Sequence, residues 1–168
     1  QTLGLPTSSA FPSSSTNASN FFAAVFYNTK ITELTLGDRV TVLGSYAFYN
    51  QKNIVAFTMG PNSQLTTIGN YAFYASNKLT NLTLGSKVET IGDYAFYQTG
   101  LTGVTISKNV AMIGNYAFGG TALSELNFET GGTVGLTIGA YAFQNSKFTE
   151  VTLPNRLQEA YTITEWGI

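Results

Sequence analysis

Ile68-Gly69-Asn70-Tyr71-Ala72-Phe73 is a six-residue segment that recurs along the chain with little change. Further copies, each with an apolar residue, a glycine and a Tyr-Ala-Phe ending, occupy residues 43–48, 91–96, 113–118 and 138–143. A degenerate copy, Ala24-Val25-Phe26-Tyr27, precedes them at the same spacing. The repeats are 22 to 25 residues long, and self-similarity at such a period is typical of a solenoid whose turns pack on their neighbours.

An L-x-x-L-x-L element follows each Tyr-Ala-Phe segment after five or six residues. Its last two apolar residues alternate with a polar one, which is the pattern of a half-buried strand. Successive strands are separated by a full turn of chain, so they must pair in parallel and form one continuous sheet. The predicted strands contain Ile31/Leu34/Leu36, Ile54/Phe57/Met59, Leu79/Leu82/Leu84, Leu101/Val104/Ile106, Leu123/Leu126/Phe128 and Phe148/Val151/Leu153.

The return path of each turn carries a second apolar pair, such as Val88 and Ile91, followed by a glycine. We assign this glycine to a tight corner, because glycine tolerates backbone conformations that other residues avoid. The Tyr-Ala-Phe segment is then expected to cross the back as a short helical or 3-10 turn. Its phenylalanines are expected to stack inside as an aromatic spine.

These repeats resemble the BspA-like, or Treponema pallidum-type, leucine-rich-repeat family, whose turns read approximately L-x-x-I-x-I-P and then V-x-x-I-G-x-x-A-F. The resemblance covers about residues 21 to 154. The family's strand-ending Pro occurs only at Pro154, and its Cys after Ala-Phe is absent. The resemblance implies a mostly β leucine-rich-repeat solenoid with a parallel sheet on the concave face and short β, 3-10 or helical turns on the back. It also implies a surface or secreted protein associated with adhesion to host proteins or other cells.

Three regions are expected along the chain. Residues 1–20 are rich in Ser, Thr and Pro without periodicity, which predicts an arm or linker, or a tail that docks on a partner. Residues 21–154 form the solenoid of about six turns, and residues 155–168 form a C-terminal cap or a truncated repeat. If the ends are uncapped, copies can join end to end, and the candidate residues for such assembly are Phe11, Phe21, Phe22, Tyr161 and Trp166.

The composition argues against several classes of function. Charged residues make up 10% of the chain and the formal net charge is −1, so there is no basic patch for nucleic acid and no sign of membrane insertion. The chain has no His and no Cys, which excludes Ser-His and Cys-His catalysis and leaves Zn²⁺ without good ligands. No pair of carboxylates typical of a glycosidase is recognisable. We therefore expect neither an enzyme nor a cofactor.

Two sets of outward residues are candidate binding surfaces. The first set has two interpretations: it is either ordinary strand surface, since Thr has a high β propensity, or a binding face, since a solenoid sheet commonly binds partners. This set contains Glu33, Thr35, Thr58, Asn81, Thr83, Thr105, Glu125, Asn127, Glu150 and Thr152. The second set is an aromatic rank that either covers the spine or contacts a glycan or protein, and it contains Tyr27, Tyr49, Tyr74 and Tyr97.

These features favour an extracellular or cell-surface recognition and adhesion module that binds a protein or glycan partner. The alternative is a structural subunit that assembles with further copies of itself into a filament or surface layer. A third hypothesis, ice binding through the Thr rank, conflicts with the glutamates of the adjacent rank. N-glycosylation sequons occur at Asn17 and Asn81.

Overall fold

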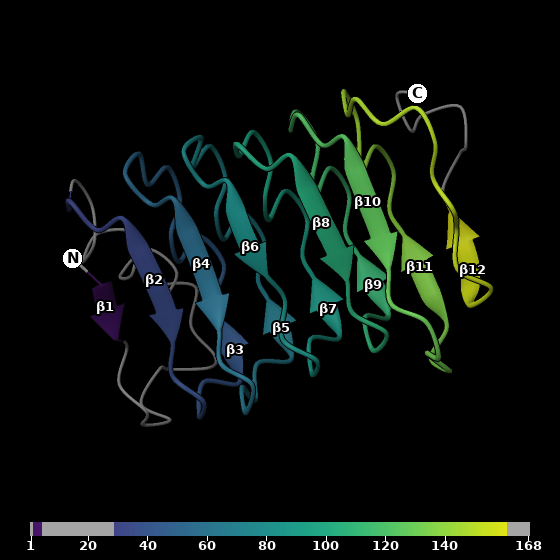
Figure 1. The fold of residues 1–168 in the computed structure, drawn as a ribbon, viewed down its shortest axis with the longest axis horizontal. Helices are drawn as coiled ribbons and strands as arrows, with labels where there is room; N and C mark the ends of the chain where they lie inside the picture. Colours follow the sequence, from purple (N-terminus) through teal and green to yellow (C-terminus); the bar gives the residue numbers. More distant parts are fainter. Residues whose placement is uncertain (1, 5–28, 161–168) are drawn as a thin grey trace.

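The structure is a computed structural model that describes residues 2–4 and 29–160. Figure 1 shows a solenoid with a front row of strands and a back row of shorter strands that run in the opposite direction. The front row contains β1 (Thr2–Gly4), β2 (Glu33–Leu36), β4 (Ala56–Met59), β6 (Asn81–Thr83), β8 (Gly103–Ile106) and β10 (Glu125–Phe128). The back row contains β3 (Val42–Leu43), β5 (Thr67–Ile68), β7 (Thr90–Ile91), β9 (Met112–Ile113), β11 (Leu136–Ile138) and β12 (Leu157–Ala160).

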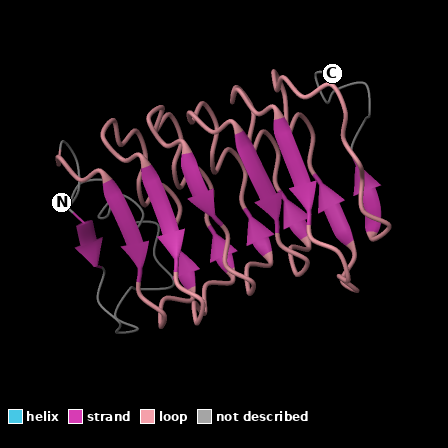
Figure 2. Cartoon of the chain, viewed as in Figure 1, coloured by secondary structure: helices cyan, strands magenta, loops and turns pink. Residues whose placement is uncertain are grey.

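Every strand pair is parallel, which confirms the predicted solenoid. Short β segments were one of the forms expected on the back, and there they join into a continuous six-stranded sheet in the order β12-β11-β9-β7-β5-β3. The front row is a four-stranded sheet, β1-β2-β4-β6, and a separate pair, β8 and β10. The expected single continuous sheet is therefore interrupted between β6 and β8. No described residue lies in a helix, as Figure 2 shows.

The ends of the solenoid add strands to both rows. Thr2–Gly4, from the region expected to be an arm, pair with Glu33–Thr35 and extend the front sheet. Leu157–Ala160 pair with β11 and extend the back sheet, with a shift of register after Leu136. The candidate assembly residues Phe11, Phe21, Phe22, Tyr161 and Trp166, together with Tyr27 and the sequon at Asn17, lie outside the described residues.

The front strand predicted to contain Phe148, Val151 and Leu153 does not form. Lys147 N still donates to Leu123 O, and after this bond the chain leaves the front row. Arg156 then holds the chain away from the front row. Its guanidinium donates to the carbonyls of Ser107, Val110 and Val134 on earlier turns. Glu150 and Thr152 of the candidate binding face consequently lie on an irregular segment.

The core is the predicted aromatic spine. Phe48, Phe73, Phe96, Phe118 and Phe143 are at most 1% exposed. Their rings stack from one turn to the next, with centroids 5.4, 5.3, 5.2 and 5.6 Å apart. One buried aromatic ring per turn, in contact with the ring of each neighbouring turn, makes the core continuous along the solenoid.

The Tyr-Ala-Phe segments are not helical, contrary to expectation. Each tyrosine has a positive φ between 54° and 60°, whereas the Ala and Phe that follow it do not, so the segment cannot continue as a helix. Amides of this segment point along the solenoid axis: Tyr71 N donates to Asp93 O and Phe73 N donates to Ala95 O in the next turn. A helical turn would instead point these groups along its own axis. The observed turn thus pairs its backbone with its neighbour.

The glycine before this turn is required by close approach and not by a corner conformation. A Cβ added to Gly92 would lie 2.5 Å from Asn70 Oδ1 and 2.7 Å from Asn70 N, on the preceding turn. Gly114 and Gly139 meet the preceding turn in the same way. None of these glycines has a positive φ, and the left-handed position belongs to the tyrosine. The prediction that this glycine forms a tight corner was therefore wrong. The glycine is required because a side chain would not fit against the preceding turn.

A ladder of side chains strengthens the same contact. Asn70 Oδ1 accepts from Asp93 N at 2.9 Å, Asp93 Oδ1 from Asn115 N at 2.7 Å, and Asn115 Oδ1 from Ala140 N at 2.8 Å. Each short polar side chain reaches the amide of the equivalent residue one turn later. Ala140 ends this ladder.

Gly92→Ala should destabilise the protein by about 2 kcal/mol or more, because the added methyl forces two turns apart. Gly103→Ala is the matched control, since the nearest atom to its added Cβ is Glu125 Cβ at 3.5 Å, an ordinary van der Waals distance. It should leave the free energy of unfolding unchanged or slightly higher. Urea denaturation followed by circular dichroism measures both, and equal effects would contradict the close-approach explanation.

Candidate binding surfaces

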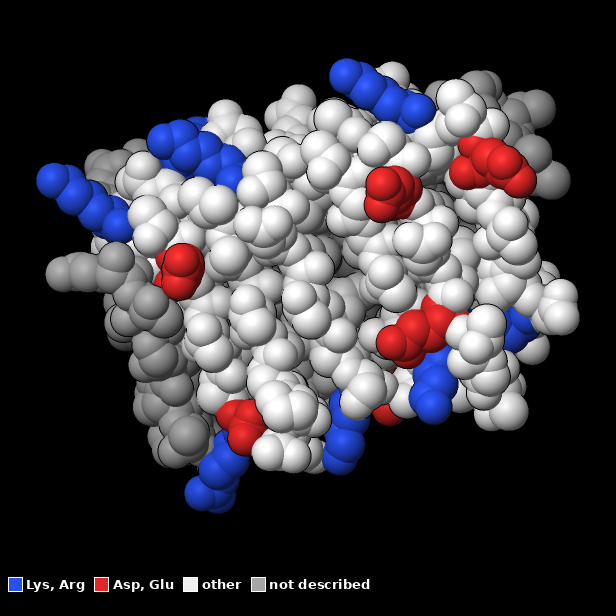
Figure 3. All heavy atoms as spheres, in the orientation of Figure 1, with Lys and Arg blue, Asp and Glu red and all other residues white. Residues whose placement is uncertain are grey.

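The front row aligns one rank of exposed polar side chains. Strand pairing places Thr35 beside Thr58, Thr58 beside Thr83, and Thr105 beside Asn127. A second rank pairs Glu33 with Ala56 and Ala56 with Asn81, and beyond the break it pairs Gly103 with Glu125. Figure 3 shows that most of this face carries no charged side chain. The predicted face is thus assembled except for Glu150 and Thr152.

The break between β6 and β8 divides this face. Leu82 and Leu84 are partly exposed there, whereas the equivalent residues Leu34 and Leu36 of β2 are buried. The Thr rank therefore does not run uninterrupted along the molecule.

A second surface consists of tyrosines on the turns that lead from each back strand to the next front strand. Its first rank stacks with ring centroids 4.9, 4.9, 4.8 and 4.8 Å apart and interplanar angles of 1° to 17°. Its second rank stacks at 5.1 and 5.2 Å. We call these two ranks the tyrosine strip, and its members are Tyr46, Tyr71, Tyr94, Tyr116 and Tyr141 in the first rank and Tyr49, Tyr74 and Tyr97 in the second.

The two ranks interlock through tilted and edge-to-face contacts. Tyr71 and Tyr74 lie 5.6 Å apart at 47°, and Tyr94 and Tyr97 lie 5.4 Å apart at 64°. The second rank ends at Tyr97, whose ring covers Gly119 of the following turn. Because each ring face is largely covered by a neighbouring ring, the strip presents ring edges and hydroxyl groups. It is a row of polar groups on a rigid apolar support.

The strip raises the pKa of its own hydroxyls. Burial raises the pKa of Tyr71, Tyr74 and Tyr94 above the ordinary value of 10.0, and nearby tyrosines raise it further. The carboxylate of Asp93 adds to the effect at Tyr71 and Tyr94. These hydroxyls therefore remain protonated at neutral pH, when each can donate and accept a hydrogen bond.

The sequence pattern predicted the second rank of the strip but not the first. Tyr49, Tyr74 and Tyr97 were recognised, whereas the tyrosine of each Tyr-Ala-Phe was assigned only to a turn. A signal was available, because an identical residue at the same position of successive turns must form a rank. Its exposure depends on the left-handed φ of these tyrosines, which the repeat pattern does not reveal.

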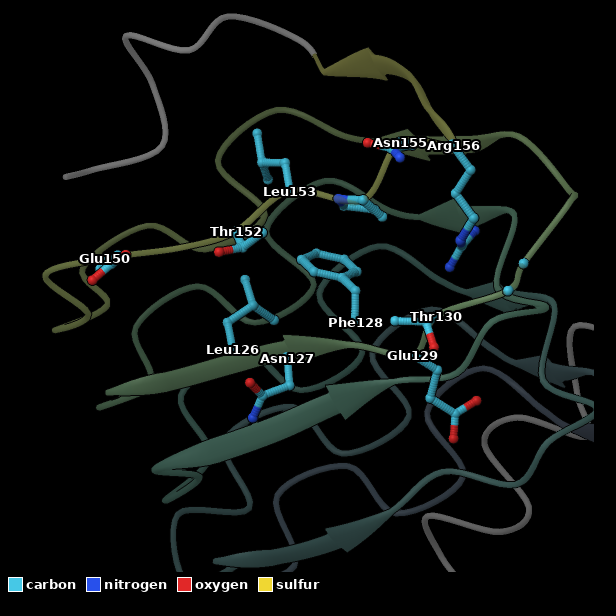
Figure 4. Close-up of a pocket in the computed structure, with 13 residues that line it drawn as sticks. Leu126, Asn127, Phe128, Glu129, Thr130, Glu150, Thr152, Leu153, Asn155 and Arg156 are labelled. Atoms are coloured by element: carbon cyan, nitrogen blue, oxygen red, sulfur yellow. The ribbon is translucent and has the colours of Figure 1, made fainter.

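A third feature is a groove of about 720 Å³ between β10 and residues 150–156. Its apolar lining includes Leu126, Phe128, Leu153 and Pro154. Figure 4 shows Glu150 at one end and Arg156 at the other, with Leu126, Phe128 and Leu153 between them. Burial lowers the pKa of the Arg156 guanidinium, whose Nη atoms bond to backbone carbonyls.

Among residues 2–4 and 29–160, no three His, Cys, Asp or Glu residues lie together in a group that could hold a metal ion. The same residues include no helix long and apolar enough to cross a bilayer.

Two solved structures share the fold. A leucine rich cell surface protein from Faecalibacterium prausnitzii A2-165 is 26% identical, with a TM-score of 0.66, over 81% of this chain and 37% of its own. A leucine-rich repeat protein from Bacteroides ovatus ATCC 8483 is 17% identical, with a TM-score of 0.50, over 78% of this chain and 45% of its own. The chain thus spans less than half the length of either protein.

Curated protein sequences give no match to the chain. The sequence pattern of the BspA type Leucine rich repeat region, in contrast, matches residues 19–136 and 133–163 in six copies. This match includes every Tyr-Ala-Phe turn and every front strand of the regular solenoid. The chain therefore belongs to the BspA-type leucine-rich-repeat family.

Proposed function

We propose that this chain is a non-catalytic recognition and adhesion module, at a cell surface or outside the cell, that binds a protein or glycan through the tyrosine strip. The observation that carries the proposal is the stacking of the strip at a regular spacing of 4.8 to 5.2 Å. Rings already held by their neighbours lose little conformational freedom on binding. Tyrosine is also enriched at protein interfaces, because it combines apolar area with a hydrogen-bonding hydroxyl.

The chemistry of the strip favours partners that present many hydrogen-bonding groups. The ring faces are covered, so a sugar cannot stack on most of them. The hydroxyls instead form an extended row that matches the hydroxyls of a glycan chain or the polar groups of a protein surface. The front face offers mainly short Thr and Asn side chains and is divided at β6 and β8, so we place the primary contact on the strip.

The surface location rests on relatives. The similar Faecalibacterium prausnitzii protein is a leucine rich cell surface protein, and the family resemblance implies surface or secreted proteins. Ice binding draws no support from the described residues, because the Thr rank is interrupted and the adjacent rank contains Glu33 and Glu125.

A fourfold variant tests the strip. Tyr71→Phe, Tyr74→Phe, Tyr94→Phe and Tyr97→Phe together remove hydroxyls and keep the stacked rings. Binding to a glycan array and to immobilised extracellular-matrix proteins should fall about tenfold or more, since each lost hydrogen bond costs roughly 1 kcal/mol.

The matched control is Thr58→Ala with Thr83→Ala on the front face, which should leave binding unchanged. The reverse pattern would move the site to the front face. If the unmodified chain binds neither surface and instead forms regular filaments in light scattering and negative-stain microscopy, the self-assembling subunit replaces this proposal.

Alkaline pH should destabilise the protein through the strip. The folded state holds the protons of Tyr71, Tyr74 and Tyr94 more tightly than the unfolded chain does. The resulting stability is fully present below the unfolded pKa of about 10 and is lost as the pH rises through the folded pKa. Urea denaturation at several pH values between about 8 and 11 should show this fall. The double variant Tyr71→Phe, Tyr94→Phe should show a shallower one, and equal slopes would contradict the assignment to the strip.

A further inference from the structure

The outer edge of β10 has no partner among the described strands. β2 and β4 each pair with a strand on both sides, whereas within residues 2–4 and 29–160 β10 pairs only with β8. Thr102 O accepts hydrogen bonds from Ser124 N and Glu125 N, which join these two turns. Within the described chain, no backbone amide of the following turn makes the equivalent bonds to Ser124 O. The backbone groups on this side of β10 are therefore available to another strand.

The groove beside this edge exposes apolar side chains that a further turn would cover. Phe128 is partly exposed, whereas the equivalent residues Leu36, Met59 and Ile106 are 2%, 5% and 0% exposed. Across the groove, Leu153 is 39% exposed. Leu126 is already buried, at 6% exposed. A strand beside β10 would place an apolar side chain over Phe128, as β4 and β8 do for their neighbours.

The chain's own segment 149–153 has the apolar alternation of such a strand, at Val151 and Leu153, yet it stays apart. In the register of the front row, Glu150 would lie directly opposite Glu125. Like charges in directly opposite positions destabilise strand pairing. The Glu125 carboxylate instead favours a cation opposite it, and Glu150 lines the same groove. The only Arg in the groove lining, Arg156, is bonded to backbone carbonyls.

We propose that this groove binds an extended peptide segment of a partner protein as an added parallel strand beside β10. The peptide carries Lys or Arg opposite Glu125. The next three residues, opposite Leu126, Asn127 and Phe128, are apolar, polar and apolar. The backbone edge of β10 supplies affinity, and the carboxylates and the apolar floor select the sequence. This site is separate from the tyrosine strip and does not depend on the function proposed for it.

Two synthetic peptides test the proposal. Thr-Lys-Val-Thr-Leu-Pro repeats the chain's own segment 149–154 with Lys in place of Glu, and Thr-Glu-Val-Thr-Leu-Pro is the matched control. Titration into the ¹⁵N-labelled chain should shift the amide resonances of Glu125–Phe128, and the Lys peptide should bind about tenfold or more tightly than the Glu peptide. Glu125→Gln should reduce this preference several-fold. Equal affinities, no binding at millimolar peptide, or shifts confined to the tyrosine strip would overturn the proposal.

A second variant tests the like-charge explanation without peptide. Glu150→Lys places a cation opposite Glu125 and should let segment 149–153 close on β10. Glu125 N already donates to Thr102 O, so the amides on the open side of β10 are those of Leu126 and Phe128. Hydrogen exchange of these two amides should then slow, and the Lys peptide should bind about tenfold more weakly. Unchanged exchange and unchanged peptide binding would contradict the proposal. Concentration-dependent association of the unmodified chain that the Lys peptide reverses would identify a second copy as the occupant instead.

Discussion

The spacing between neighbouring turns is the constraint on which the rest of the structure depends. Backbone bonds from one Tyr-Ala-Phe segment to the next, such as Phe73 N to Ala95 O at 2.7 Å, fix this spacing. The spacing brings a stacked phenylalanine into every turn of the core, and it leaves no room for a Cβ at Gly92. The left-handed tyrosine φ orients the peptide groups for these bonds, and the glycine allows the turns to approach. Each part of the segment therefore serves the same contact.

A fixed spacing converts a repeated residue into a rank. Buried positions give the phenylalanine spine, polar positions give the ladder from Asn70 to Ala140, and exposed positions give the tyrosine strip. The strip's rigidity follows from the same cause, because ring stacking at this distance holds each side chain between its neighbours. A surface built this way repeats one chemical group along its length, which suits an extended and repetitive partner better than a compact one.

The ends of the solenoid differ from its middle because the contact has no successor there. Ala140 stands where the three preceding turns carry Asn70, Asp93 and Asn115, and no described turn follows to receive its side chain. The front strand after β10 is lost, while β12 still continues the back sheet. Arg156 bridges this mismatch through carbonyls of earlier turns. The open groove is thus a consequence of the two rows ending at different points.

The sequence by itself determined the fold class, the family, the phenylalanine spine and the front register, because these depend on periodicity and on apolar alternation. It also predicted the outward rank from Thr35 to Asn127 and half of the tyrosine strip. The tertiary structure decided what depends on contacts between turns. The left-handed tyrosines, the reason for the glycines and the first tyrosine rank require backbone pairing with a neighbouring turn, which a repeat pattern does not specify. The missing last front strand likewise depends on where Arg156 bonds, and only the folded chain brings its guanidinium to the carbonyls of Ser107, Val110 and Val134.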